Sequence, residues 1–285
     1  MKKAIAIAAA AIAGLAMFKA LIGAFEPRLV FFPSPGEDRN PSSVGIVYEA
    51  VPIRTSDGES LVAWQLEPDD PIADVVYFHG NGGNLSVWLP VLASLHAHRL
   101  RVLAVDYRGY GLSSGRPSEE GVYRDAEAVA QHAARRRATP AARPLVFWGR
   151  SLGGPIAAAA THTVRPDGLV LESSFADKAA VIRSNPVLRM LNVFGAYRFE
   201  TVKLLNDFSG PVLVLHGNRD SIVPFALGRE LHDLLNTPKR FVEIAGADHN
   251  DLIDASRADY WTPVLDFVRN LRGRTQLPRN GAVHK

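Results

Sequence analysis

Short apolar runs alternate with longer helix-like stretches from residue 73 onward. The runs that predict strands are 73–79, 101–106, 144–149, 168–172, 211–216 and 240–244. The stretches that predict helices are 84–97, 118–137, 151–163, 225–235 and 254–271. Continuously apolar strands that alternate with helices are typical of a parallel sheet covered on both faces. The pattern therefore predicts an α/β fold with a mostly parallel central sheet flanked by helices.

Two regions depart from this alternation. Before it, the runs 48–54 and 61–66 flank the turn sequence Ser56-Asp57-Gly58, which predicts a β-hairpin. Within it, residues 173–208 hold many apolar and aromatic side chains in no strand-and-helix alternation. We interpret this segment as a small cap over the carboxyl edge of the sheet, with most of its apolar residues against the main body and some lining an apolar pocket.

The N-terminal stretch has a different pattern again. Residues 4–25 are apolar and are interrupted only by Lys19. As a helix they would span roughly 33 Å, about the hydrocarbon thickness of a bilayer. We therefore expect a single-pass membrane anchor over residues 1–26, with the remaining chain extracytoplasmic because two lysines precede the stretch. The alternative is a signal peptide cut at Ala11-Ile12-Ala13, which would leave a secreted or periplasmic protein.

The distribution of proline residues and of the strand and helix pattern divides the remaining chain into three parts. Residues 27–45 are rich in proline and predict a linker that follows the anchor. Residues 46–272 carry the strand and helix pattern and form the predicted catalytic domain, including the cap. The last residues, 273–285, predict a disordered tail.

Charge and cysteine content exclude several classes of function. The net charge is only +3, and the basic residues cluster toward the two ends rather than in a stripe interleaved with aromatic residues. Nucleic-acid binding is therefore not expected. The chain has no cysteine, which excludes disulfides, thiolate catalysis and thiolate metal sites. It also has no HExxH motif and no clustered carboxylates, so we expect neither a metal nor another cofactor.

The pattern G-x-S-x-G occurs twice, around Ser113 and around Ser151. A nucleophilic serine at the edge of a parallel sheet needs a sharp turn between a strand and a helix, with small neighbours. Ser151 follows the strand 144–149, lies between Gly149 and Gly153, and precedes an alanine-rich helix. Ser113 is separated from its strand and is followed by Arg-Pro, which favours a loop. We therefore predict Ser151 as the nucleophile.

Several segments in this order resemble the α/β-hydrolase superfamily. They are YFHGNGGN (77–84), VDYRGYGLSSG (105–115), WGRSLGG (148–154), LESSF (171–175), HGNRDSIVP (216–224) and GADHND (246–251). The chain is similar in particular to a branch of membrane-anchored, single-pass serine hydrolases that includes depalmitoylating and lysophospholipid-cleaving enzymes. The resemblance covers roughly residues 45–270 and implies the fold and the reaction type.

A serine hydroxyl needs a base, and the base needs a third group to orient it. The resemblance implies the chain order serine, acid, histidine. His249 is the predicted base because it lies in a loop just after the strand 240–244. Asp220, which follows the strand 211–216, is the predicted acid. Glu172 remains an alternative acid, since some members of the superfamily take the acid from the end of the preceding strand.

The oxyanion of the tetrahedral intermediate needs two N–H donors. One is expected to be the backbone N–H of Leu152, at the start of the helix after the nucleophile. The resemblance implies that the other comes from Asn81 in the glycine-rich loop 79–83. A glycine-rich loop before a helix can instead bind phosphate, but the lysine of a P-loop is absent.

These residues predict a serine hydrolase that cleaves a carboxylic ester or thioester through an acyl-enzyme. The expected partner is a small-molecule or lipid-like acyl substrate, because the anchor would hold the site near a membrane. Two alternatives are a serine peptidase of the same fold and a hydrolase-fold binding protein without turnover. A peptidase needs a recognition site for a peptide terminus, which the sequence does not reveal, and a binding protein has no need of all three catalytic side chains.

Overall fold

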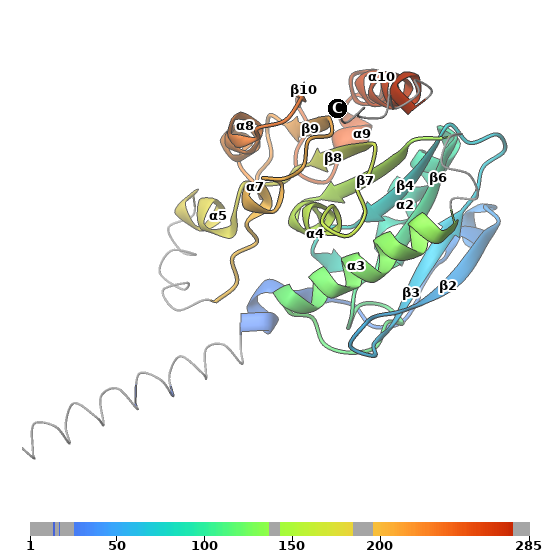
Figure 1. Ribbon diagram of the computed structural model, residues 1–285, viewed down its shortest axis with the longest axis vertical. Helices are drawn as coiled ribbons and strands as arrows, with labels where there is room; N and C mark the ends of the chain where they lie inside the picture. Colours follow the sequence, from blue (N-terminus) through green and yellow to red (C-terminus); the bar gives the residue numbers. More distant parts are fainter. Residues whose placement is uncertain (1–13, 15–16, 18–25, 137–142, 185–195, 276–285) are drawn as a thin grey trace, which may run out of the picture.

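An eight-stranded sheet lies at the centre of the computed structural model, which describes residues 14, 17, 26–136, 143–184 and 196–275 (Figure 1). Its strand order is β10-β9-β8-β7-β4-β6-β3-β2. The parallel strands are β4 (Ala73–Phe78), β6 (Leu100–Asp106), β7 (Leu145–Arg150), β8 (Gly168–Glu172), β9 (Val212–Gly217) and β10 (Lys239–Ile244). Each lies within one residue of an apolar run that predicts it, and the mostly parallel sheet is confirmed.

A β-hairpin extends the sheet at one edge. β2 (Tyr48–Arg54) pairs antiparallel with β3 (Ser60–Leu66), and β3 pairs antiparallel with β6. Tyr48 faces Leu66 and Arg54 faces Ser60, so the turn at residues 55–59 closes the hairpin as the sequence predicts.

Successive residues of the inner strands contribute alternately to two apolar layers, one on each face of the sheet. In β7, Leu145 and Phe147 join the layer on one face of the sheet, whereas Val146 and Trp148 join the layer on the other face. Because side chains alternate along a strand, a run that is apolar at every position must be covered on both faces. This is why the continuous apolar runs identify interior strands.

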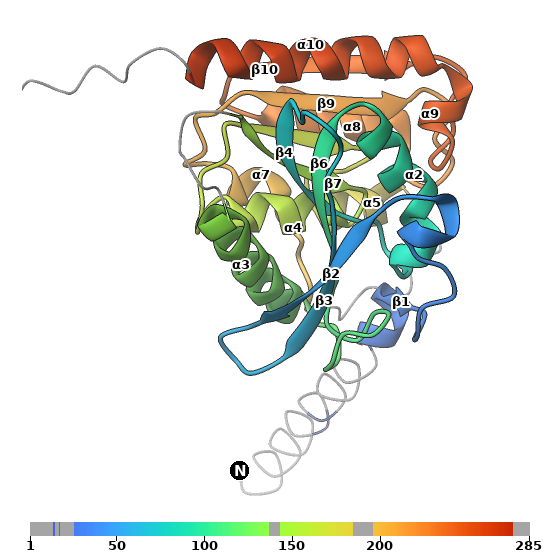
Figure 2. The same ribbon diagram turned by 90° about the vertical axis from the view of Figure 1, so that its right-hand side faces the viewer.

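Helices cover both layers. One layer contains apolar residues of α3 (Glu119–Arg136), α4 (Gly153–Ala160), α5 (Lys178–Ser184), α7 (Thr201–Leu204) and α8 (Phe225–Leu234); those of α7 are only partly buried. α2 (Leu85–Ala97), α9 (Leu252–Ala255) and α10 (Arg257–Thr275) contribute to the other. Figure 2 shows the sheet between α3 and α4 on one side and α2 on the other. The flanking helices are confirmed.

The strand order creates a crevice at the centre of the sheet. From β4 the chain passes to β6 on one side and then returns to β7 on the other. Ligands of open parallel sheets bind at such a switch point, outside the carboxyl ends of the strands. The loop 79–84 follows β4 and the turn at Ser151 follows β7, so both begin beside this crevice.

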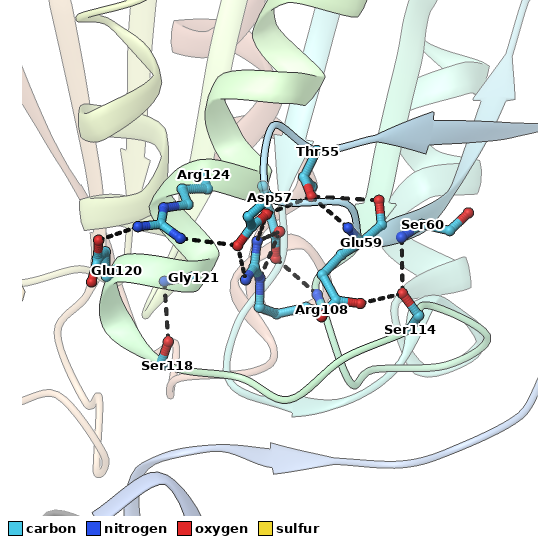
Figure 3. A network of polar contacts seen from close by, with 11 residues as sticks. Thr55, Asp57, Glu59, Ser60, Arg108, Ser114, Ser118, Glu120, Gly121 and Arg124 are labelled. Carbon is cyan, nitrogen blue, oxygen red and sulfur yellow. Dashed lines mark hydrogen bonds and ion pairs between the residues drawn. The ribbon is translucent and has the colours of Figure 1, made fainter.

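A polar network fixes the loop after β6 to the hairpin turn (Figure 3). The Arg108 guanidinium holds both carboxylate oxygens of Asp57, at 2.8 and 3.0 Å, and its Nε donates to Asp125 at 2.9 Å. Arg124 also donates to Asp57, at 3.1 Å. These contacts give Arg108 a structural role.

The predictions for the chain ends and part of the cap fall largely outside the described residues. These are most of the anchor over residues 1–26, residues 276–285 of the tail predicted at 273–285, and the part of the cap at 185–195. Residues 273–275, which the sequence analysis assigns to the tail, belong instead to α10. Within the described ranges, no helix has both the length and the apolar character needed to cross a bilayer. The described parts of the cap region include α5, α7 and residues 196–200, which form neither helix nor strand. Residues 27–45 contain β1 (Phe32–Pro33) and the 3₁₀ turn Pro41–Val44.

Candidate active site

Ser151 lies in a strained turn between β7 and α4. Its φ is +52°, a left-handed backbone conformation that is uncommon for a residue with a side chain. The turn is held by the Ser151 N–H, which donates to the Glu172 carbonyl at 2.8 Å, and by the Ser174 hydroxyl, which donates to the Ser151 carbonyl at 3.0 Å. The side chain of Ser151 is thereby directed to the carboxyl edge of the sheet, where it lines a cavity.

The neighbouring glycines are required because the strand and helix converge here. A Cβ on Gly149 would lie 2.3 Å from the Gly153 carbonyl oxygen. A Cβ on Gly153 would lie 2.0 Å from the Phe78 carbonyl oxygen, and one on Gly154 would lie 1.9 Å from the Ser174 hydroxyl. A Cβ at Gly149 or Gly153 would collide with backbone, and one at Gly154 would collide with the Ser174 side chain, which is why the turn at Ser151 has glycine at these positions.

The structure brings His249 and Asp220 together. His249 Nδ1 lies 2.8 Å from Asp220 Oδ2, and both residues are buried. Because the carboxylate can only accept, Nδ1 carries the hydrogen and Nε2 is left free to accept a proton. Burial raises the pKa of Asp220, but hydrogen bonds from His216 and His249 outweigh burial and hold that pKa below its ordinary value. Asp220 is therefore charged at neutral pH.

His216 is a supporting residue that sequence reasoning did not assign. It is fully buried at the end of β9, with Nε2 2.8 Å from the Val223 carbonyl and 3.2 Å from Asp220 Oδ2. Since a carbonyl only accepts, Nε2 carries the hydrogen and points it between the two oxygens. The backbone N–H groups of Ile222 and Val223 bond the other carboxylate oxygen. The sequence feature that could have identified His216 is its position at the end of a predicted strand, shortly before the candidate acid.

The alternative acid, Glu172, is occupied elsewhere. Its Oε2 accepts hydrogen bonds from the Trp148 indole and the Tyr260 hydroxyl, each at 2.9 Å. Its Oε1 lies 3.2 Å from Arg150 Nη1. In the described part of the chain, no histidine contacts this carboxylate.

Ser151 and His249 line the same cavity, so the candidate nucleophile and the candidate base lie at one site. Within the described residues, their side chains do not form a direct hydrogen bond. Such bonds are often long before substrate binds and tighten in the reacting complex. The structure thus pairs His249 with Asp220 by a hydrogen bond and places this pair on the same cavity as Ser151.

The loop that carries Asn81 passes beside the nucleophile. A Cβ on Gly80 would lie 3.6 Å from the Ser151 Cβ and 2.9 Å from the Trp88 ring. For the backbone N–H groups of Asn81 and Leu152, the described residues provide no acceptor. Asn81 lines the cavity, and Leu152 is the residue immediately before α4. Asn81 and Leu152 therefore each have a backbone N–H without an acceptor in the described chain, and both residues are close in sequence to groups beside Ser151.

The second G-x-S-x-G serine has a structural role. The Ser113 hydroxyl donates to the Asp106 carbonyl at 2.7 Å and accepts the Val62 N–H at 2.9 Å. Within the described chain, neither a histidine nor another base contacts it. Its hydrogen bonds connect the loop after β6 to β3.

The cavity beside Ser151 has a volume of about 1010 Å³. Its apolar lining comes from Phe32, Val87, Trp88, Pro90, Val91, Ile222 and Ile253. Its polar lining, apart from Ser151 and His249, includes Asn81, Ser94, Arg150, Asn250, Asp254 and Arg257. A largely apolar cleft with a few convergent polar groups is typical of a site for a small organic ligand.

Comparison with known proteins identifies relatives over most of the chain. A family model described as alpha/beta hydrolase fold matches residues 75–203. The alpha/beta hydrolase domain-containing protein WAV2 of Arabidopsis thaliana is 30% identical over 87% of this chain and 89% of its own length. An uncharacterized protein of Mycobacterium tuberculosis is 33% identical over 96% of this chain and 95% of its own. The uncharacterized membrane protein YNL320W of Saccharomyces cerevisiae is 31% identical over 80% of this chain and 82% of its own length.

Solved structures share the fold at lower identity. The esterase Pf2001 of Pyrococcus furiosus has a TM-score of 0.69 at 18% identity, and the match covers 85% of this chain and 97% of that one. The esterase RhEst1 from Rhodococcus has a TM-score of 0.58 at 20% identity, covering 78% of this chain and 99% of that one. At these identities the likeness establishes the fold alone.

Proposed function

Since the chain belongs to the alpha/beta hydrolase superfamily, we propose that it is a serine hydrolase that cleaves carboxylic ester or thioester bonds through an acyl-enzyme. The observation that carries this proposal is the strained turn at Ser151, which faces the same cavity as the hydrogen-bonded pair His249–Asp220. The esterase names of the fold neighbours are consistent with this reaction class.

The first half of the reaction acylates the serine. Ser151 Oγ attacks the carbonyl carbon of the substrate while His249 Nε2 takes the hydroxyl proton. The carbonyl oxygen becomes an oxyanion, which accepts hydrogen bonds from the backbone N–H groups of Asn81 and Leu152. The tetrahedral intermediate then collapses, the bond to the alcohol or thiol breaks, and the leaving group takes the proton from His249.

The second half releases the acid and restores the enzyme. A water attacks the acyl carbon and gives a proton to His249, and the new intermediate expels Ser151 Oγ, which recovers its proton from the imidazole. Asp220 holds the His249 ring in the required tautomer and stabilises the imidazolium in both halves. His216 and the N–H groups after Asp220 keep the carboxylate ionised and oriented.

We further propose that the acyl group is lipid-like and is drawn from a membrane. The apolar residues that line the cavity favour such a chain over a charged or highly polar substrate. The apolar N-terminal stretch is the proposed anchor, and it would hold the domain, on the extracytoplasmic side, next to lipid. The name of the yeast relative as a membrane protein supports the membrane association, but says nothing about the side of the membrane.

Labelling with a fluorophosphonate probe tests the proposal. The full-length protein in mild detergent, a Ser151→Ala variant and a Ser113→Ala variant are each treated with the probe. We expect wild type and Ser113→Ala to be labelled and Ser151→Ala to remain unlabelled. An unlabelled wild type, or equal labelling of all three proteins, would overturn the proposed mechanism.

Hydrolysis of p-nitrophenyl esters of increasing chain length tests the substrate class. We expect kcat/KM to rise from acetate to esters of medium or longer chains, because each added methylene that is buried contributes about 0.8 kcal/mol of binding. A maximum at acetate would contradict a lipid-like acyl substrate while leaving the serine mechanism intact.

A further inference from the structure

The segment that joins the apolar N-terminal stretch to the domain binds the side chain of Asn81. The Phe32 N–H donates to Asn81 Oδ1 at 3.2 Å, and Asn81 Nδ2 donates to the Val30 carbonyl. The amide side chain thus occupies the donor and acceptor positions that a neighbouring strand would use. Through these bonds the backbone of residues 30–32 determines where Asn81 lies.

The same segment also pairs with the backbone of the loop. β1 (Phe32–Pro33) lies parallel to β5 (Gly82–Gly83), and the Ser34 N–H donates to the Gly83 carbonyl at 2.9 Å. Figure 2 shows β1 close to the N-terminal end of α2, which follows this loop. Residues 32–34 therefore pair with the backbone of this loop at Gly82 and Gly83.

Tyr110 holds Asn81 from the inner side. Its hydroxyl lies 2.9 Å from the Asn81 carbonyl oxygen and 3.0 Å from Asn81 Oδ1, so its one hydrogen is shared between these two acceptors. Every polar atom of the Asn81 side chain and its carbonyl oxygen have partners, whereas its backbone N–H has no acceptor in the described chain. The contacts fix the residue and leave its backbone N–H, one of the two proposed oxyanion donors, without an acceptor in the described chain.

The N-terminal segment is itself fixed at two buried points. Phe31 is only 3% exposed and lies edge-on to Tyr197 and Phe199, with ring centroids 5.9 and 6.1 Å apart. Glu26 is 4% exposed, lies 2.6 Å from Lys178 Nζ, and accepts the N–H of Ala196 at 2.7 Å. Burial raises the pKa of Glu26, but these bonds outweigh it and hold the pKa below its ordinary value.

We propose that residues 26–33 are a positioning strut for the oxyanion loop, and that Asn81 is coupled to the strut through its side chain. The proposal rests on the function proposed above, because it assigns a cause to the placement of one oxyanion donor. A loop that contains Gly80, Gly82 and Gly83 has little conformational preference of its own. The strut replaces that missing preference with hydrogen bonds that originate at the junction with the apolar N-terminal stretch.

The expected consequence concerns kcat rather than substrate binding. Oxyanion donors act when charge develops in the transition state, and loss of one donor lowers kcat about 100- to 1000-fold. Loosening a donor that is still present should have a smaller effect, because the N–H reaches its position for only part of the time. Ground-state binding of the acyl chain depends on the apolar wall and should change little.

The experiment measures kcat and KM for a p-nitrophenyl ester with the full-length protein in mild detergent. Asn81→Ala keeps the backbone N–H and removes the side-chain bonds, and we expect kcat to fall about 10- to 100-fold with KM changed less than about 3-fold. Tyr110→Phe removes only a hydroxyl, and we expect a fall of about 3- to 10-fold in kcat.

A pair of matched variants tests the strut itself. Phe31→Leu loosens the segment at its aromatic anchor, whereas Phe208→Leu trims an equally buried ring that lies in the same apolar layer but makes no contact with the loop. Both should lower the midpoint of thermal unfolding by similar amounts. Only Phe31→Leu should lower kcat, by about 3- to 30-fold, and it should weaken inhibition by an alkyl boronic acid, which mimics the tetrahedral intermediate, in the same proportion.

The outcomes separate this inference from the proposed function. If wild type shows no hydrolysis that depends on Ser151, the proposed function fails. If wild type is active but Asn81→Ala and Tyr110→Phe keep its kcat, the strut has no role in positioning the loop. Equal losses of kcat in Phe31→Leu and Phe208→Leu would likewise overturn it, since general destabilisation would then explain both. Should Phe31→Leu fail to fold, the two variants on the loop side decide the matter.

Discussion

Arg150, the residue before the candidate nucleophile, holds the main chain of the candidate base: its Nη2 donates to the His249 carbonyl at 2.8 Å. The same guanidinium lies 3.2 Å from Glu172 and 5.1 Å from the centre of the Trp88 ring. Arg150 and Glu172 are both almost fully buried. One cation therefore ties the loop of His249 to the ends of β7 and β8.

This buried ion pair predicts a large effect of single substitutions. Arg150→Met leaves the Glu172 carboxylate buried without its cation, and we expect the free energy of unfolding to fall by about 3–5 kcal/mol. The double variant Arg150→Met/Glu172→Gln should recover much of that loss. Chemical unfolding in the same detergent solution measures all three proteins.

An exposed pair provides the control for that measurement. Arg183 and Glu230 lie 3.2 Å apart at the surface, so Arg183→Met should change stability by less than about 1 kcal/mol. If Arg150→Met were as mild as Arg183→Met, the guanidinium would not be needed to balance Glu172.

The contacts of Gly153 predict that an added methyl group disables the turn at Ser151. A Cβ there would meet the Phe78 backbone, which cannot move without displacing β4. We expect Gly153→Ala to lower kcat/KM at least 100-fold, measured with a p-nitrophenyl ester. Gly210→Ala is the matched control, because its Cβ would meet only the Phe208 ring, whose far end can shift. Equal activity of the two variants would show that the turn tolerates a wider strand-to-helix spacing.

The hydrogen bond between Asp220 and His249 predicts a loss of catalysis when the carboxylate is removed. Asp220→Asn keeps the size of the side chain but no longer stabilises the protonated imidazole or enforces its tautomer, and we expect kcat to fall about 10³- to 10⁴-fold. The comparison is Asp248→Asn, because Asp248 precedes His249 in sequence but bonds the backbone N–H groups of Ser221 and His249. Asp248→Asn should lower kcat by less than about 10-fold. A larger loss of kcat in Asp248→Asn than in Asp220→Asn would assign the role of the acid to Asp248.

Arg108 predicts the pH dependence of stability at the hairpin turn. Its guanidinium holds the pKa of Asp57 well below the ordinary value near 3.9. A carboxylate with a depressed pKa stabilises the fold above the pKa of the unfolded chain, and this contribution is lost as the pH falls toward the folded-state pKa. Wild type should therefore exceed Asp57→Asn in stability by about 1–3 kcal/mol at pH 7, and the difference should narrow below about pH 4.

Asp69→Asn is the control for this pH series. Asp69 is exposed and forms no ion pair within the described chain, so its substitution should leave the pH profile of stability unchanged. Thermal unfolding of the three proteins between pH 3 and pH 7, in buffers of equal ionic strength, measures the differences. If the difference in stability between wild type and Asp57→Asn stayed constant with pH, this result would contradict the role assigned to Arg108.

The interior strands and the turn at Ser151 could be predicted because their causes are local. A strand that is buried on both faces must be apolar at every position, and convergence of a strand and a helix excludes side chains at Gly149 and Gly153. Helix boundaries were less accurate. The predicted helix 254–271 is divided into α9 and α10, because Ser256 is extended and its hydroxyl accepts the Asp259 N–H to cap α10.

The supporting residues could not be predicted because their causes are distant in sequence. Arg150 reaches the His249 carbonyl across 99 positions, and Asn81 reaches Val30 across 51. Hydropathy and local turn signals contain no information about such pairs. His216 could be predicted in part. Its position at the end of a strand can be read from the sequence, but its contact with Asp220 is known only from the structure.

The most direct test of the central claim is to locate the covalent adduct. Wild-type protein is reacted with a fluorophosphonate, digested and mapped by tandem mass spectrometry. The account predicts a single adduct on the peptide that contains residue 151, at the serine oxygen. An adduct at any other side chain, with Ser151 unmodified, would contradict it.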